Sequence, residues 1–125
     1  MVVADVNARV WRPDAASPLA AGAEAMARQA ASFLAASAHD EIDGARVDTT
    51  HALTTADGSH VYAGAVVHGP LRAYLATVSG PAGRAAHKYI VSYPDAASAQ
   101  AALDAALARQ QAQGYASIGT VDAEA

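Results

Sequence analysis

Apolar residues recur with the period of a helix in the first third of the chain. The stripe consists of Leu19, Ala23, Met26, Ala30, Phe33 and Ser37, with Leu34 beside them. Alternating spacings of four and three residues are typical of an amphipathic helix. Ser17 suits the N-cap and Pro18 the first helical position, so we expect the helix to follow a strand over residues 6–11 and a break over residues 12–18. We expect the stripe to dock on a sheet, with a helix–helix dimer seam as the alternative.

From residue 45 onward the period shortens to two, which indicates half-buried β-strands. Asp57-Gly58 predicts a type I′ hairpin turn, because both central residues of that turn need positive φ. Tight turns join antiparallel neighbours, so the pattern predicts an antiparallel meander of four strands. The strands are expected over residues 47–55, 60–67, 71–78 and 88–93, with further reversals at Gly69-Pro70 and residues 80–83.

A second helix is predicted over residues 96–113. Its apolar face carries Ala99, Leu103, Ala106, Leu107 and Gln110. Asp95 is suited to cap its start, and Gly114 to end it in the left-handed conformation, with Tyr115 making the accompanying hydrophobic contact. A last strand is expected over residues 115–121.

These elements predict an α+β fold in which an antiparallel β-meander of about four to five strands is covered by two amphipathic helices. At 125 residues the chain has the size of a single domain with one core. Residues 1–44 supply the N-terminal strand and helix, and residues 45–121 supply the meander, the second helix and the last strand. Residues 122–125 are expected to form a frayed tail.

Composition excludes several kinds of chemistry. The chain has no cysteine, so it has no disulfide, no thiolate nucleophile and no cysteine-containing zinc or iron–sulfur site. The net charge is −4 and there is no basic stripe, which speaks against a general nucleic-acid binder. The N-terminus lacks the pattern of a signal peptide, and no apolar run is long enough to span a membrane. We therefore expect a cytoplasmic protein that does not contact a membrane, with a mature secreted domain as the alternative.

Three histidines fall on one face of the predicted meander. In the register set by a turn at Asp57-Gly58, Thr55 faces His60, His51 faces Gly64 and Val47 faces His68. His60 and His68 are then about 26 Å apart along one strand. Because side chains at that separation cannot converge on one ion, the pattern predicts no metal site.

Two further segments contain polar residues close together. His39, Asp40, Glu41 and Asp43 could bind a cation, but their spacing is not that of a calcium loop, and a solvated helix end explains them better. Residues 80–84 resemble a phosphate loop only superficially, because Pro81 lacks an amide donor. We expect no cofactor, no metal and no catalytic group.

Both faces of the strand over residues 60–67 are apolar. One face carries Val61, Ala63, Ala65 and Val67, and the other carries Tyr62 and Val66. One face is expected to lie under the helices, so the other needs a second cover. We favour a homodimer formed through the sheet, followed by a small-molecule pocket between sheet and helix.

A set of spacings in the second half of the chain matches a known family. The matching residues are Tyr62 in the first strand, Gly80 and Gly83 in a loop, Tyr93 before the helix, Ala99, Leu103 and Leu107 within it, and Gly114-Tyr115 at its end. In these spacings the segment from about His51 to Tyr115 resembles the WGR domain, a DNA-contacting module of poly(ADP-ribose) polymerases and bacterial proteins. The resemblance implies a meander followed by a helix, and contact with DNA.

The chain departs from the family at the residues that contact DNA. Ser79 and Pro81 stand where the family has its Trp and Arg, and Ala86-His87 stands where it has a Gly-Gln pair. Arg84 and Lys88 remain nearby as phosphate contacts.

The sequence as a whole favours a small non-catalytic binding or interaction module. We expect either a WGR-like nucleic-acid-binding domain or a dimeric domain that binds a protein partner. The contact residues that we nominate are Arg72, Tyr74, Arg84 and Lys88. The alternative is a small enzyme or ligand-binding protein that uses a cavity between sheet and helix, with His51, His68 or His87 as general base.

Overall fold

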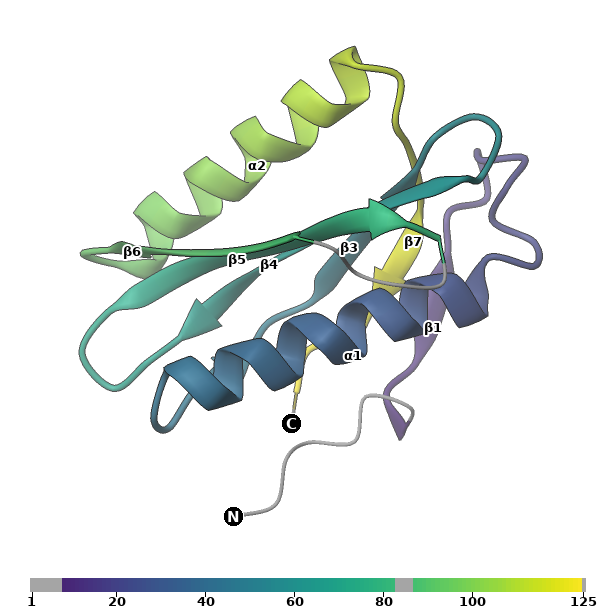
Figure 1. The fold of residues 1–125 in the computed structure, drawn as a ribbon. Coiled ribbons are helices and arrows are strands. Elements are labelled where there is room, and N and C mark those ends of the chain that lie inside the picture. Colours follow the sequence, from purple (N-terminus) through teal and green to yellow (C-terminus); the bar gives the residue numbers. More distant parts are fainter. Residues whose placement is uncertain (1–7, 83–86, 125) are drawn as a thin grey trace.

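The computed structural model describes residues 8–82 and 87–124. Its two helices are α1 (Glu24–Glu41) and α2 (Ala96–Ala112). The strands in these residues are β1 (Trp11–Pro13), β2 (Arg46–Val47), β3 (Thr50–Thr54), β4 (His60–His68), β5 (Ala73–Pro81), β6 (His87–Tyr93) and β7 (Ala116–Val121). Within the described residues the strands form one antiparallel sheet, ordered β1-β7-β3-β4-β5-β6, with β2 paired to β4 (Figure 1). The predicted α+β fold with an antiparallel meander is confirmed.

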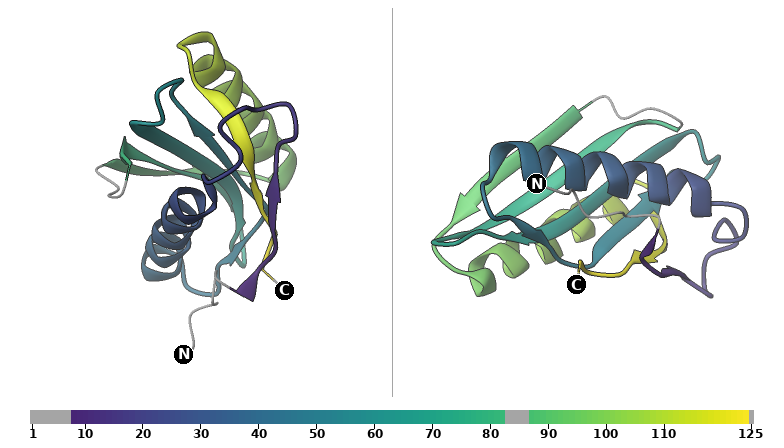
Figure 2. Two further views of the ribbon diagram at one scale, coloured as in Figure 1. Left: turned by 90° about the vertical axis from the view of Figure 1, so that its right-hand side faces the viewer. Right: turned by 90° about the horizontal axis from the view of Figure 1, so that it is seen from below.

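The two helices lie on opposite faces of the sheet, as both figures of the fold show (Figures 1 and 2). One face of β4, with Val61, Ala63, Ala65 and Val67, packs against α1. The other face, with Val66, packs against Ala99, Leu103 and Ala106 of α2. Over Val66 the second cover that this face requires is therefore α2 of the same chain.

Helix α1 begins later than the pattern predicts. Its N-cap is Ala23, and Ser17 instead accepts a hydrogen bond from the Leu19 amide at 3.3 Å within a turn. Gly22 separates the two segments with a φ of 84°. This left-handed conformation interrupts a helix, so the predicted start at Ser17 and Pro18 is wrong.

The buried stripe of α1 is also rotated from its predicted position. Phe33 is 39% exposed, whereas its neighbour Leu34 is fully buried. The residues that α1 buries are Ala27, Ala30, Ala31, Leu34, Ala35, Ser37 and Ala38. The prediction that Phe33 docks on the sheet is wrong. Alanine side chains let a helix lie close to a sheet, and one leucine then fills the remaining space.

The register of the β3–β4 hairpin agrees with the sequence, although the turn type does not. His51 pairs with Gly64, and the Thr55 amide donates to the His60 carbonyl. A type I′ turn needs positive φ at both central residues, but Asp57 has none, and Gly58 alone has a φ of 72°. The predicted turn and the observed turn are centred on the same two residues, so they give the same strand register.

At Val47 the pairing differs by one residue from the prediction. Val47 pairs with Val67 rather than His68, because Asp48 and Thr49 separate β2 from β3. This shift turns Val47 toward α1, where it is fully buried.

The ends of α2 and the last strand follow the prediction. The Asp95 side chain accepts a hydrogen bond from the Ser98 amide at 2.8 Å, and Gly114 has a φ of 103°. The Tyr115 amide then donates to the Gln110 carbonyl at 3.0 Å. Strand β7 follows directly and lies between β1 and β3.

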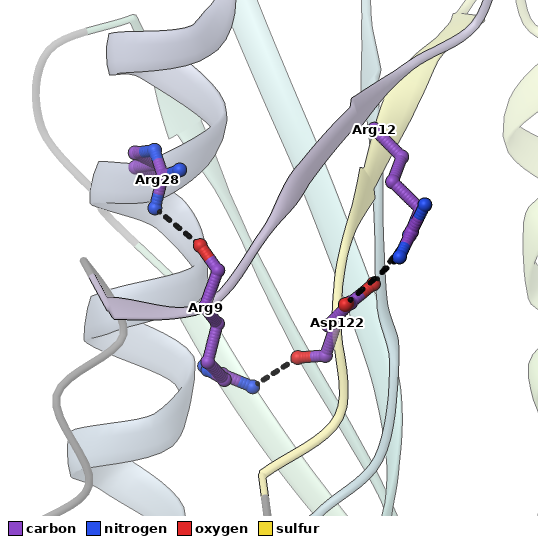
Figure 3. A network of polar contacts seen from close by, with 4 residues as sticks. All are labelled: Arg9, Arg12, Arg28 and Asp122. Atoms are coloured by element: carbon purple, nitrogen blue, oxygen red, sulfur yellow. Dashed lines mark hydrogen bonds and ion pairs between the residues drawn. The ribbon is translucent and has the colours of Figure 1, made fainter.

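Polar contacts hold residues 122–124 against distant segments of the chain, which differs from the expected frayed tail. Asp122 accepts hydrogen bonds from Arg9 through its carbonyl and from Arg12 through its carboxylate, at 2.7 and 2.8 Å (Figure 3). The Arg28 guanidinium donates to the Arg9 carbonyl at 3.0 Å and joins α1 to this network. Burial lowers the pKa of Arg9, and Glu124 and Asp122 oppose that shift.

Glu124 connects the tail to the core. Its carboxylate lies 2.9 Å from His39 Nε2 and accepts a hydrogen bond from the Val47 amide at 3.2 Å. Ala125 lies outside the described residues, as do residues 6 and 7 of the predicted first strand. The described strand β1 starts at Trp11 and includes Pro13, which an edge strand tolerates.

Candidate functional site

A cavity of about 380 Å³ lies between the second half of α2 and the face of the sheet formed by β4, β5 and β6. Its walls are Tyr62, Leu75, Thr77, Ser79, Tyr89, Val91, Tyr93, Ala106, Arg109, Gln110 and Tyr115. Four of the chain's five tyrosines are in this set. The predicted space between sheet and helix therefore exists, and tyrosine is the most frequent residue in its wall.

The strand pairing explains why these side chains share one face. Thr77 pairs with Tyr89 and Leu75 pairs with Val91, so the alternate residues of β5 and β6 point to the same side as Tyr62. On α2 the buried stripe runs through Leu103 and Ala106. The next positions on that face are Arg109 and Gln110, which are polar. The cavity forms where the apolar stripe of α2 ends.

The aromatic rings line the cavity from its base to its rim. Tyr62 is 9% exposed and stands at the base, where its ring meets Tyr115 edge to face with centroids 6.3 Å apart. Tyr89 and Val91 are 65% and 47% exposed on β6, the last strand of the sheet. The cavity is therefore open toward that edge.

Positive charge in the cavity comes from α2. Arg109 is the one ionised group in the wall at neutral pH, since the wall contains no carboxylate, lysine or histidine among the described residues. Burial raises the pKa of the Tyr62 phenol, while the Thr77 hydroxyl and the Arg109 guanidinium oppose that rise. All three groups belong to residues of the cavity wall.

None of the three histidines proposed as general bases is in the described wall of this cavity. His51 lies on β3, where burial lowers its pKa and the carboxylates of Asp104 and Asp48 oppose the shift. His68 Nε2 lies 3.1 Å from Asp48 Oδ2. His87 pairs with Ser79 at the start of β6 and is exposed. The structure does not bring a histidine to the tyrosine cluster.

The nominated contact residues do not form one surface in the described part of the chain. Arg72 lies in the turn before β5, about 20 Å along the strands from the level of Lys88. The ammonium group of Lys88 pairs with Glu41 at 3.1 Å. Tyr74 packs against the core beneath α1. Arg84 lies outside the described residues.

The polar residues at the C-terminal end of α1 have partners of their own. His39 contacts Glu124, and Glu41 contacts Lys88. In residues 8–82 and 87–124, no three histidine or acidic side chains lie together as a metal site would require. No described helix is long and apolar enough to cross a membrane.

Sequence reasoning placed Tyr62 on an apolar face but missed the cluster. The signal was the alternation of Tyr89, Val91 and Tyr93, which puts three large side chains on one side of β6. Arg109 was also missed, although it lies three residues after Ala106 and so continues the face of α2.

The chain matches no model of a known protein family, no curated protein and no solved structure.

Proposed function

We propose that the protein is a non-catalytic binding module whose site is the cavity between α2 and strands β4, β5 and β6. The ligand is a small flat molecule that lies against the tyrosine rings. The observation that carries the proposal is a cavity of about 380 Å³ with four tyrosines in its wall. That volume is at the lower end of ordinary small-molecule sites.

The chemistry of the wall supports binding ahead of catalysis. Its apolar surface comes from the tyrosine rings and from Leu75, Val91 and Ala106. Its polar groups are phenols, two hydroxyls, an amide and a guanidinium. Such groups orient a ligand by hydrogen bonds, whereas proton transfer at neutral pH needs a titrating base within reach of the reacting atom. No histidine or carboxylate in the described wall supplies that base.

Contact with DNA and homodimerisation stay predictions. Lys88 lends the DNA hypothesis little support, because its charge is paired with Glu41. For the homodimer, the Val66 part of the sheet is already covered by α2. The cavity is a better supported site than either surface.

The proposal is tested with N-phenyl-1-naphthylamine, an uncharged aromatic probe whose fluorescence rises in apolar surroundings. We expect saturable binding to the wild-type chain that is weakened about two- to tenfold by Tyr89→Ala, since one aromatic contact contributes about 0.5–1.5 kcal/mol. Tyr89→Phe, which keeps the ring, should bind as the wild type does.

The matched control is Leu71→Ala, because Leu71 is 91% exposed and lies outside the cavity. It should leave the binding curve unchanged. If the probe fails to bind at high micromolar protein, or if Tyr89→Ala and Leu71→Ala behave alike, the cavity is not the site.

A further inference from the structure

We infer that the ligand of this cavity is a flat aromatic monoanion, with a carboxylate that pairs with Arg109 and a ring that lies among the tyrosines. This inference rests on the proposed function, because it assigns a ligand class to the same cavity.

The charge of the wall favours an anionic ligand. Arg109 is the only charged residue among the described residues that line the cavity. No described carboxylate forms an ion pair with it. A ligand that brings one negative charge supplies the counter-charge that the wall lacks.

The C-terminal end of α2 does not need the guanidinium of Arg109 as a cap. The last carbonyls of the helix are satisfied by the backbone, since Gln113 N donates to the Arg109 carbonyl and Tyr115 N donates to the Gln110 carbonyl. Capping by the backbone leaves the Arg109 side chain free of that task. Its position over the cavity is therefore available for recognition.

The donor groups of the wall indicate how the ligand lies. Arg109, Tyr62 and Thr77 all line the cavity, and Tyr62 and Thr77 are 9% and 8% exposed. Guanidinium and hydroxyl groups donate hydrogen bonds, so a carboxylate finds its donors in this part of the wall. The rest of the ligand then extends between the rings toward Tyr89 and Val91 at the open edge.

The number of cations favours a carboxylate over a doubly charged phosphate. Phosphate sites usually combine several cations or add the amides of a helix N-terminus. Here there is one guanidinium, the only lysine of the chain is paired with Glu41, and the helix end beside the cavity is a C-terminus. One guanidinium balances the single charge of a carboxylate, which it binds through two parallel hydrogen bonds.

The test compares 2-naphthoate with 2-naphthamide, which share a ring system and differ in charge. Displacement of N-phenyl-1-naphthylamine from the full chain measures both affinities. We expect naphthoate to bind about tenfold more tightly than naphthamide, as one charge-assisted pair near solvent provides. Arg109→Gln should bring the ratio of the two affinities close to one, whereas Arg109→Lys should retain part of the preference for naphthoate.

The matched control is Arg46→Gln, because Arg46 is an exposed arginine on β2 outside the cavity. This variant should keep the full preference for naphthoate. Raising the salt concentration from about 50 mM to about 500 mM should weaken the binding of naphthoate and leave that of naphthamide unchanged, since salt screens only the charge.

Failure of the inference can be told apart from failure of the proposed function. If naphthoate and naphthamide bind equally well and Tyr89→Ala weakens both, the ligand has no required carboxylate, but the cavity is still the site. A preference for naphthoate that survives Arg109→Gln would also overturn the inference. If the naphthylamine probe binds but neither naphthoate nor naphthamide does, the inference is again overturned and the cavity stays the site. If none of the three compounds binds, the proposed function is overturned as well.

Discussion

The two faces of the sheet differ in how closely their helices cover them. Under α1 the described residues pack closely and form what we call the sealed face, because the helix contributes mainly alanines and Leu34 to the contact. Under α2 the contact is made by Ala99, Leu103 and Ala106, and the sheet beyond them stays open above Tyr89. Strand β6 shows both situations, since Ile90 packs under α1 while Tyr89 on the other side is 65% exposed. Small residues on a helix close a face, whereas a stripe that ends early leaves a cavity.

The largest expected effect is on the sealed face. Leu34→Ala should lower the free energy of unfolding by about 3 kcal/mol, because the fully buried leucine is surrounded by a well-packed core. Phe33→Ala should cost under about 1 kcal/mol, since that ring is 39% exposed. Urea unfolding followed by circular dichroism measures both. A larger loss for Phe33 than for Leu34 would show that α1 is rotated as the sequence pattern predicted.

An intermediate effect compares the same substitution on both helices. Ala31→Leu should cost about 2 kcal/mol, because the sealed face has no room for three more carbon atoms. Ala106→Leu should cost less than half as much, since the added atoms can enter the cavity. Ala106→Leu should also weaken the binding of the naphthylamine probe. Equal losses of stability would contradict the difference between the faces.

The smallest effect is a dependence on pH at His51. Burial holds the pKa of His51 below its usual 6.5, so the unfolded chain binds this proton more readily than the folded chain. The contribution to stability is complete above pH 6.5 and is lost as the pH falls from there toward the lowered pKa of the folded state. The wild type should therefore lose more stability than His51→Gln between neutral and mildly acidic pH. The melting temperatures of the two proteins measure this. If they change by the same amount across this pH range, the effect is absent.

Local interactions account for the parts of the fold that the sequence predicted well. The β3–β4 register follows from the alternation of strand residues around Asp57-Gly58, and the ends of α2 follow from Asp95 and Gly114. Each depends on residues close together in the chain. The start of α1 was missed because a local alternative at Ser17 looked equally good, while Gly22 interrupts the chain.

Alanine explains why the orientation of α1 could not be predicted. Its helical period can be drawn through Phe33 or through Leu34, and the alanines around them fit a buried or an exposed position almost equally well. The choice was made by contact with the sheet. Glu124 was likewise placed by distant partners, since His39 and the Val47 amide are far from it in sequence.

The candidate site was predicted only in outline. Alternation by itself put Tyr62 on one face of β4, and it put Tyr89 and Tyr93 on one face of β6. The contribution of Arg109 and Tyr115 depends on which helix covers that face and on where its apolar stripe ends.

By itself, the sequence determined the α+β class, the antiparallel meander, the register of its first hairpin and the limits of α2. Each of these follows from backbone preferences and side-chain periods that act over a few residues. The tertiary structure decided that β7 lies between β1 and β3, that the helices take opposite faces and that four tyrosines meet beside Arg109. Those features depend on contacts between distant segments, because packing chooses among arrangements that local preferences leave nearly equal in free energy.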